Sequence, residues 1–416
     1  MRGLLKILAA LQIFLSALAF AKFEFELSDK SKIELETQNP PRINSLWHSP
    51  KLRLFASASE NLICVWDARN FKQMLRLYDE KFGNIKEIVC PSDFKTLYAA
   101  GGEPGESGKV LFINLERDES SAIAESSDEF LCLAISPDDK YLAAGSADGK
   151  LVVFSLPERK IVSSGDFKGQ KVCALKFNGA SSSLAILLSN GQVISRERED
   201  NFKTNGTSFS TGGGAQTLLF LNNTALGFPQ DFGYDAGFAS VQRFLGRTLR
   251  SAKIPIKNPS VAELRYNTAN AIAIANPHGE LITMRPSLDN PNFAFFEKSP
   301  SPIIDLSPCA AAAIIGSTSN GEIFIWDEQS KSIAGGIVIC DESCKNYAVF
   351  SDSGSVFSSD KKLLKVASKD GADITDSAFS EARTREAISR IGAKALPKAK
   401  NAKAAPKGQG KKSKAK

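Results

Sequence analysis

The sequence predicts an all-β domain assembled from a repeated unit of about 42 residues. The first observation is a turn pattern that consists of a turn residue, a glycine, a polar residue and a branched apolar residue. Asn320-Gly321 is an example, because both central positions of a type I′ hairpin turn require positive φ. The glycines of six such matches lie at residues 108, 149, 191, 279, 321 and 354.

The second observation is a proline that follows a short apolar run at nearly the same spacing. It occurs at Ser49-Pro50, Cys90-Pro91, Ser136-Pro137 and Ser307-Pro308. Proline suits the second position of a turn, so each pair marks the end of one strand and the start of the next. Each unit therefore consists of four strands, and "FLCLAISPDDKYLAAGSADGKLVVFSLPERKIVSSGDF" contains all of them.

These units resemble a known repeat. "LAISPDDKYLAAGSADGKLVVFSL" is similar to a WD40 repeat, and "LICVWDARN" and "IFIWDEQSK" carry the Trp-Asp pair of that family at Trp66-Asp67 and Trp326-Asp327. The resemblance covers about residues 41–340 and is poor between 200 and 260. It implies a β-propeller of four-stranded blades around a central channel. The Gly-His pair of the family is missing and the chain has two histidines, so we expect apolar packing to hold the blades.

We expect seven full repeats over residues 22–360. A weaker series of strand-like segments begins at Ile337, so a split eighth blade is the alternative. The N-terminal stretch "KFEFELSDKSKIELETQ" alternates apolar and polar residues and predicts two strands. We expect these strands to close the ring by pairing with an incomplete C-terminal blade, which would remove exposed edges. The first strands of the seven repeats are expected near Ile43, Ile85, Leu131, Val172, Gln216, Val261 and Ile303.

Residues 1–21 have the pattern of a secretory signal peptide. Arg2 and Lys6 precede the apolar run "ILAALQIFLSALAF", and Ala19-Phe20-Ala21 is an A-x-A cleavage site. An uncleaved membrane anchor is the alternative, but the apolar run is short and ends in small residues. We therefore expect cleavage between Ala21 and Lys22 and a periplasmic protein.

The C-terminal residues 392–416 are rich in lysine and alanine, with nine lysines and no acidic residue. Such a segment buries too little apolar surface to fold, so we expect a disordered basic tail. Residues 361–391 are expected to form a linker with a short helix. The nine lysines of this segment contribute more positive charge than the net charge of the whole chain, which is +6, so the rest of the protein is mildly acidic. The run Lys394–Lys416 is either a solubilising tail or a tether to an anionic envelope surface; nucleic acid is not expected.

The seven cysteines do not form a metal-binding or haem-attachment motif. Most of them lie in apolar strand segments, where cysteine behaves as a small hydrophobic residue. Cys340 and Cys344 are close in the sequence and are the candidate pair for a local disulfide in an oxidising compartment.

The sequence contains no catalytic or cofactor-binding motif at a predicted strand-to-helix turn, where such motifs occur, so we expect neither an enzyme nor a cofactor. The first hypothesis is a monomeric protein-interaction scaffold, since binding residues of a rigid fold usually lie on its loops. The alternative is an enzyme or ligand-binding protein that uses the central channel. Convergent polar groups at the channel mouth would favour the alternative, and a broad face with exposed aromatic residues would favour the scaffold.

The resemblance also implies that the turns between second and third strands share one face with the loops between blades. The candidate partner-binding residues on this face are Phe82, Asp148, Asn190, His278 and Asn320. Phe82 is the expected anchor, because exposed aromatic residues often dominate interfaces. An exported propeller of this kind resembles the accessory proteins of periplasmic nitrate reductase systems in ε-proteobacteria, which implies a role in assembly or maturation of a redox enzyme.

Overall fold

The computed structural model describes residues 21–394 apart from 28, 50–52, 118, 212–214, 221–224, 231–236, 244–248, 266–270, 285–291 and 310–312. The expected signal peptide up to residue 20 and the basic tail from residue 395 lie outside the described residues. No described helix has the length and apolar character needed to cross a membrane.

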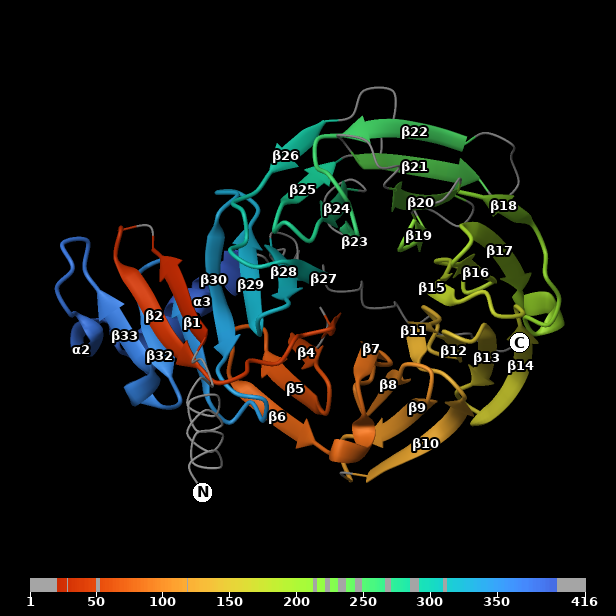
Figure 1. The fold of residues 1–416 in the computed structure, drawn as a ribbon, viewed down its shortest axis with the longest axis horizontal. Helices are drawn as coiled ribbons and strands as arrows, with labels where there is room; N and C mark the ends of the chain where they lie inside the picture. Colours follow the sequence, from red (N-terminus) through yellow and green to blue (C-terminus); the bar gives the residue numbers. More distant parts are fainter. Residues whose placement is uncertain are drawn as a thin grey trace, which may run out of the picture.

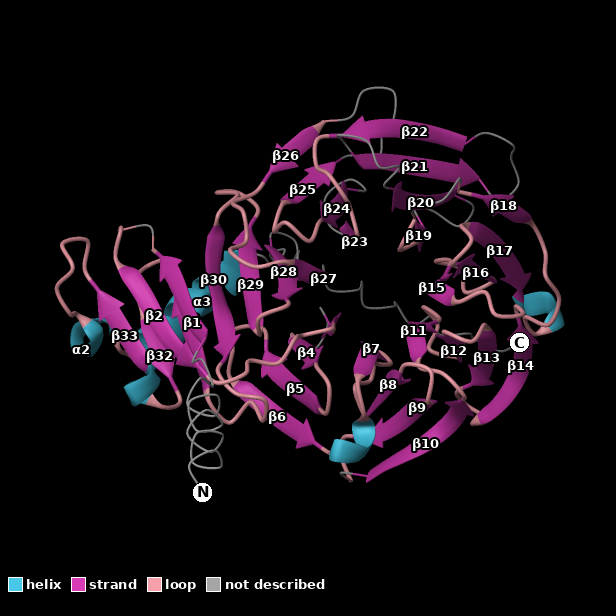
Figure 2. Cartoon of the chain, in the orientation of Figure 1, coloured by secondary structure: helices cyan, strands magenta, loops and turns pink. Residues whose placement is uncertain are grey.

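Seven antiparallel sheets surround a central space, as in a β-propeller (Figures 1 and 2). The strands of each blade are given from the innermost outward. The first blade contains β3 (Ser45–Ser49), β4 (Leu54–Ala58), β5 (Leu62–Asp67) and β6 (Gln73–Tyr78), and the second contains β7 (Ile85–Val89), β8 (Thr96–Glu103), β9 (Ser107–Asn114) and β10 (Glu119–Ser126). The third blade contains β11 (Phe130–Ile135), β12 (Tyr141–Ser146), β13 (Lys150–Ser155) and β14 (Lys160–Asp166), and the fourth contains β15 (Val172–Phe177), β16 (Ser183–Leu188), β17 (Gln192–Glu197) and β18 (Ser208–Ser210).

The remaining three sheets contain β19 (Leu219–Phe220), β20 (Ala225–Gln230), β21 (Gly237–Arg243) and β22 (Leu249–Ile254); β23 (Val261–Arg265), β24 (Ala271–Ala275), β25 (Leu281–Met284) and β26 (Phe293–Phe295); and β27 (Ile303–Cys309), β28 (Ala313–Thr318), β29 (Glu322–Asp327), β30 (Ile333–Ile339), β31 (Tyr347–Ser351) and β32 (Val356–Ser358). The predicted all-β propeller of repeated four-stranded units is confirmed. Short 3₁₀ helices η1 (Glu80–Phe82) and η2 (Arg198–Asp200) follow β6 and β17.

Apolar packing between neighbouring blades holds the ring. Every residue of β5 and β16 is buried, whereas the outermost strand β10 is mostly exposed. Middle strands are buried because a blade lies on each side of them. Trp66 Nε1 donates a hydrogen bond to Ser57 Oγ at 3.0 Å, but Trp326 Nε1 donates instead to the backbone oxygen of Glu297. The tryptophans therefore have different partners in different blades.

The N-terminal strands pair with a C-terminal strand, but in a different place from the one expected. β1 (Ala21–Glu26), β2 (Lys32–Thr37) and β33 (Leu364–Ala367) form a separate three-stranded sheet, which lies outside the ring beside the seventh blade (Figure 1). The expectation that these strands close the ring is wrong, because β27 and β3 are direct neighbours.

The alternating sequence explains the position of this sheet. Phe23 and Phe25 project from one face of β1 and are buried with Phe324 and Phe350 of the seventh blade. The ring centroids of Phe25 and Phe350 are 4.8 Å apart. The apolar face of the sheet therefore covers the broad side of the seventh blade, and its charged face remains exposed.

The segment expected to be a linker belongs to the folded body. After η3 (Lys361–Leu363) and β33, the chain forms α2 (Thr375–Ala378) and α3 (Glu381–Lys394). Ile388 of α3 is fully buried, and a Cβ atom on Gly335 would lie 2.6 Å from its Cδ1 atom. Arg385 of α3 also donates to the backbone oxygen of Asn70 at 3.1 Å. The helix thus fastens the last sheet to the first blade, and it includes residues 392–394 of the expected tail.

Candidate partner-binding face and central channel

Strand direction places the loops of the blades on one side of the ring. Consecutive strands in each blade are antiparallel, so the turn between the second and third strands leaves the sheet at the same edge as the loop to the next blade. We call this side the turn face. Its described parts are the turns 59–61, 104–106, 147–149, 189–191, 276–280 and 319–321 and the loops 79–84, 127–129, 167–171, 211, 215–218, 255–260 and 296–302.

Hydrogen bonds connect the turns of this face to the loops beside them. Asn276 Nδ2 donates to the backbone oxygen of Lys257 at 2.8 Å in the sixth blade. Asn320 Nδ2 donates to Ser301 Oγ at 3.1 Å in the seventh. The turn face is therefore a set of turns and loops that are fixed to one another, which suits the recognition of a partner by a preformed surface.

Asp148 is held by several hydrogen bonds. Its carboxylate accepts hydrogen bonds from Ser126 Oγ at 2.7 Å and Ser127 Oγ at 2.8 Å, and also from Ser146 Oγ and the N–H of Lys150. Burial raises the pKa of this carboxyl, but the four hydrogen bonds to its charged form outweigh burial and lower the pKa to about 2. Asp148 therefore orders the turn of the third blade.

The three other polar candidates are exposed on the turn face. Asn190 accepts a 2.9 Å hydrogen bond from the N–H of Gln192, and this contact shapes its turn. His278 lies 3.5 Å from the amide nitrogen of Asn258. Asn320 makes the contact with Ser301 described above. The structure places these residues in different blades around the ring, so they are parts of one face but not of one cluster.

The expectation that Phe82 is an exposed anchor is wrong. Phe82 is 7% exposed and packs with Ala58, Ile63 and Ile85 between the first two blades. Phe82 is the last residue of the 3₁₀ helix η1, and its ring belongs to the core cluster between these blades. Phe82 therefore stabilises the contact between blades and offers no surface to a partner.

Two other aromatic residues are exposed at the edge of the turn face. Tyr78 is 47% exposed and ends β6, and Phe295 is 58% exposed and ends β26. Both are the last residues of an outermost strand, which is where that strand reaches the turn face. The alternation in "MLRLYDEKF" contains the signal for Tyr78, because Leu75 and Leu77 point inward and Tyr78 follows them.

The inner strands enclose a central cavity of about 400 Å³. Its charged and reactive side chains come from five blades and include His48, Glu87, Cys132, Cys173, Lys176 and Asp305. Burial raises the pKa of the Cys173 thiol, which makes it a weaker nucleophile at neutral pH. Among the described residues no group of three or more histidine, cysteine or acidic side chains is arranged to hold a metal ion.

Polar side chains of the innermost strands connect neighbouring blades. Glu87 Oε2 accepts a hydrogen bond from the N–H of Leu133 at 2.7 Å, which joins the second blade to the third. Ser45 Oγ accepts from the N–H of Ile88 at 3.2 Å and joins the first blade to the second. Glu87 and Ser45 thus have backbone partners on a neighbouring inner strand, which gives these two side chains a structural role.

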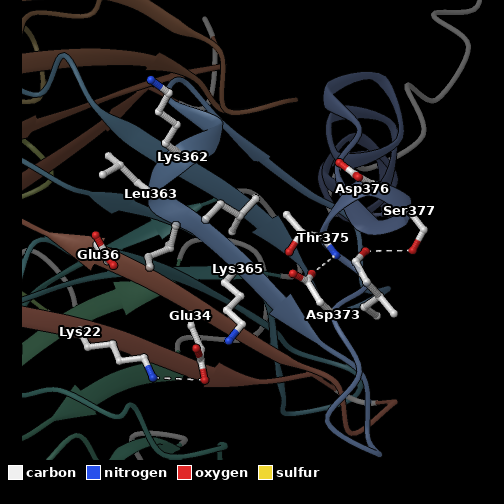
Figure 3. A pocket seen from close by; sticks show the side chains of 13 residues that line it. Lys22, Glu34, Glu36, Lys362, Leu363, Lys365, Asp373, Thr375, Asp376 and Ser377 are labelled. Atoms are coloured by element: carbon white, nitrogen blue, oxygen red, sulfur yellow. Dashed lines mark hydrogen bonds and ion pairs between the residues drawn. The ribbon is translucent and has the colours of Figure 1, made fainter.

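A larger groove of about 860 Å³ lies outside the ring, between the three-stranded sheet and α2 (Figure 3). Lys22 extends along it and forms ion pairs with Glu24 at 2.8 Å and Glu34 at 3.2 Å. On the opposite wall, Asp373 accepts a hydrogen bond from the N–H of Thr375 at 2.9 Å. The groove is lined by the positive side chains of Lys22, Lys362 and Lys365 and by the negative side chains of Glu34, Glu36, Asp373 and Asp376. It therefore has no single charge that would select a ligand.

The comparisons with known proteins agree with this architecture. The family model of the WD domain, G-beta repeat, matches residues 30–67 and 122–155. The first match extends from β2 to β5 and the second from β10 to β13, so each ends on the third strand of a blade.

An uncharacterized WD repeat-containing protein of Schizosaccharomyces pombe (strain 972 / ATCC 24843) is 32% identical over 143 residues, which are 33% of this chain and 24% of that protein. The chain therefore spans about a quarter of the length of the curated relative that it matches. Together with the family matches, this similarity supports the resemblance to WD40 repeat proteins.

Proposed function

We propose that this protein is a non-catalytic interaction scaffold that binds a protein partner through the turn face. WD40 repeats typically mediate contacts between proteins. The observation that supports this role here is the position of Tyr78 and Phe295, two exposed aromatic residues at the edge of a face whose turns are fixed by hydrogen bonds. Tyrosine and phenylalanine contribute large contact areas and lose little conformational entropy on binding.

The finer proposal concerns the compartment and the partner. The sequence of residues 1–21 favours export to the periplasm, and the partner we propose is a periplasmic redox enzyme, such as a nitrate reductase, during its assembly or maturation. The protein acts as a monomer. Its basic C-terminal segment adds attraction to an anionic envelope surface.

Affinity purification of the tagged full-length chain from its native host, followed by mass spectrometry, tests the proposal. We expect a periplasmic redox enzyme to copurify with the natural chain and with Met74→Ala, but much less with Tyr78→Ala. Met74 is the matched control, because it is 56% exposed on the same strand β6. Equal recovery of the partner with both variants would exclude Tyr78 as an anchor.

N-terminal sequencing of the protein recovered in the same experiment tests export. We expect the mature chain to begin at Lys22. Cleavage at this position would remove Ala21, the first residue of β1, which pairs with Thr37 of β2, and would keep the strand from Lys22 onward. A chain that retains Met1 and fractionates with the cytosol would overturn the periplasmic assignment while leaving the scaffold role open to the binding test.

A further inference from the structure

Two buried cysteines from distant parts of the sequence lie against each other. Cys64 is on β5 of the first blade, and Cys344 is in the turn between β30 and β31 of the last sheet. Both are fully buried in one apolar cluster that also contains Trp66 and Ile337. Both are free thiols in the structure, and the nearby Cys64 contributes to the raised pKa of the Cys344 thiol.

The side chain of Gln73 shows how close the two sulfur atoms are. Its Nε2 atom lies 3.6 Å from Cys64 Sγ and 3.4 Å from Cys344 Sγ, and it also donates to the backbone oxygen of Cys344 at 3.4 Å. Both sulfurs therefore lie around one amide nitrogen, which places two thiols from distant parts of the chain beside each other.

The turn that carries Cys344 is fixed against the first blade. Arg76 of β6 donates to the backbone oxygen of Ser343 at 2.9 Å. Asp341 accepts hydrogen bonds from Ser343 Oγ at 2.7 Å and from the N–H of Asn346 at 2.9 Å, which close the turn. The position of Cys344 relative to Cys64 is therefore set by contacts on both sides, so the thiols are held in place for a reaction.

We propose that Cys64 and Cys344 are the site of a disulfide that joins the first blade covalently to the end of the last sheet. The oxidant is a disulfide, such as glutathione disulfide or the oxidised form of a dithiol oxidase. The thiolate of one cysteine attacks a sulfur of the oxidant and forms a mixed disulfide, and one thiolate leaves. The other cysteine then attacks the protein sulfur of the mixed disulfide and expels the second thiolate. The protein loses two protons and two electrons, and the oxidant becomes two thiols.

The structure favours this pair over Cys340 and Cys344, which the sequence suggested. The Cys340 thiol points to the backbone oxygen of Val338, at 3.7 Å, whereas the Cys344 thiol shares the amide of Gln73 with Cys64. The nearby Cys64 and burial both raise the pKa of Cys344 well above its ordinary value. Because the thiolate is the reactive form, we expect the pair to oxidise slowly in the folded protein and faster during folding.

The test is to unfold the full-length protein in urea and refold it with reduced or oxidised glutathione. Free thiols are then alkylated, and the disulfide-linked peptides are identified by mass spectrometry. We expect a peptide that links Cys64 to Cys344 after oxidative refolding, while Cys90 and Cys132 are alkylated. A Cys340–Cys344 peptide, or alkylation of both Cys64 and Cys344 under oxidising conditions, would overturn the proposal.

Variants and a stability measurement complete the test. Cys64→Ser should leave Cys344 alkylated, and Cys132→Ser, which alters another buried cysteine, should keep the Cys64–Cys344 peptide. The urea midpoint of the natural protein should fall when the disulfide is reduced, and that of Cys64→Ser should not change with the redox buffer. The peptide map of the natural protein decides the proposal even where a variant fails to fold, and none of these results depends on the proposed function.

Discussion

Asp305 Oδ2 on β27 accepts a 2.7 Å hydrogen bond from the backbone N–H of Leu46 on β3. This contact joins the innermost strand of the last blade to that of the first. The other carboxylate oxygen, Oδ1, accepts a 2.8 Å hydrogen bond from the N–H of Leu306. The last and first blades are thus connected at the channel wall by a hydrogen bond between a carboxylate and a backbone N–H. Glu87 forms the same kind of hydrogen bond between the second and third blades.

We expect Asp305→Ala to lower the free energy of unfolding by about 2 kcal/mol, because it leaves buried backbone donors without their charged acceptor. Asp305→Asn keeps one oxygen acceptor and should have a smaller effect. Urea denaturation followed by tryptophan fluorescence measures both. An alanine variant with the natural urea midpoint would show that the contact does not stabilise the ring.

Phe71 provides a second test of stability. It is fully buried in a left-handed backbone conformation, with φ of 57°, in the turn after β5, and its ring centroid lies 5.6 Å from that of Phe55. We expect Phe71→Ala to cost about 3–5 kcal/mol, because it opens a cavity. Phe295→Ala removes an exposed ring and should change stability by less than about 0.5 kcal/mol. Similar urea midpoints for the two variants would contradict this packing role.

The periodic features of the sequence predicted the ring, because they depend on local conformation. Gly149 and Gly321 have φ of 92° and 80°, so the glycines adopt the expected left-handed conformation. The predicted type I′ turn is wrong, because Asp148 and Asn320 do not have positive φ. Ile85, Val172, Val261 and Ile303 begin β7, β15, β23 and β27, as expected. Gly108 is the exception. It lies within β9, and Gly105 is the turn residue with positive φ; a Cβ atom on Gly108 would lie 2.0 Å from the backbone oxygen of Asp128.

Features that depend on distant contacts could not be predicted in the same way. The pairing of β2 with β33 and the shared position of Cys64 and Cys344 beside Gln73 involve residues far apart in the sequence, and no local pattern marks them. Phe82 was expected to be an exposed anchor of the turn face, but it is 7% exposed at the end of the short helix η1. The candidate site was therefore predicted as a face, while its exposed aromatic residues became evident only from the structure.

The lowered pKa of Asp148 predicts a pH dependence. An aspartate in an unfolded chain has a pKa of about 3.9, and the pKa of Asp148 in the folded protein is about 2. Its stabilising contribution is complete above pH of about 4 and is lost as the pH falls through about 2. We expect Asp148→Asn to be less stable by about 1 kcal/mol at pH 6, after allowance for solvent screening. The two proteins should converge near pH 2, and a difference that stays constant from pH 6 to 2 would rule out this titration.

Tyr78 and Phe82 should respond differently to the same substitution. We expect Tyr78→Ala to weaken partner binding by about 2 kcal/mol or more, with little change in stability, because an exposed aromatic side chain loses only interface contacts. Phe82→Ala should lower the thermal stability and leave binding nearly unchanged, since this ring packs between blades. Surface plasmon resonance and thermal unfolding measure the two effects. Loss of binding in Phe82→Ala at unchanged stability would reverse the assignment.

Deletion of residues 395–416 should act through charge alone. This deletion leaves α3 intact, because the helix ends at Lys394. The removed segment is rich in lysine and has no acidic residue, so it should attract an acidic partner or an anionic surface over a distance. We expect the deletion to lower the association rate more than it raises the dissociation rate. Its effect should fade as salt shortens the Debye length from about 10 Å at 0.1 M to about 3 Å at 1 M. Surface plasmon resonance at low and high salt measures both rates, with Tyr78→Ala as the control whose defect persists at high salt. A binding defect of the deletion that is unchanged in 1 M salt would mean that the segment makes specific contacts.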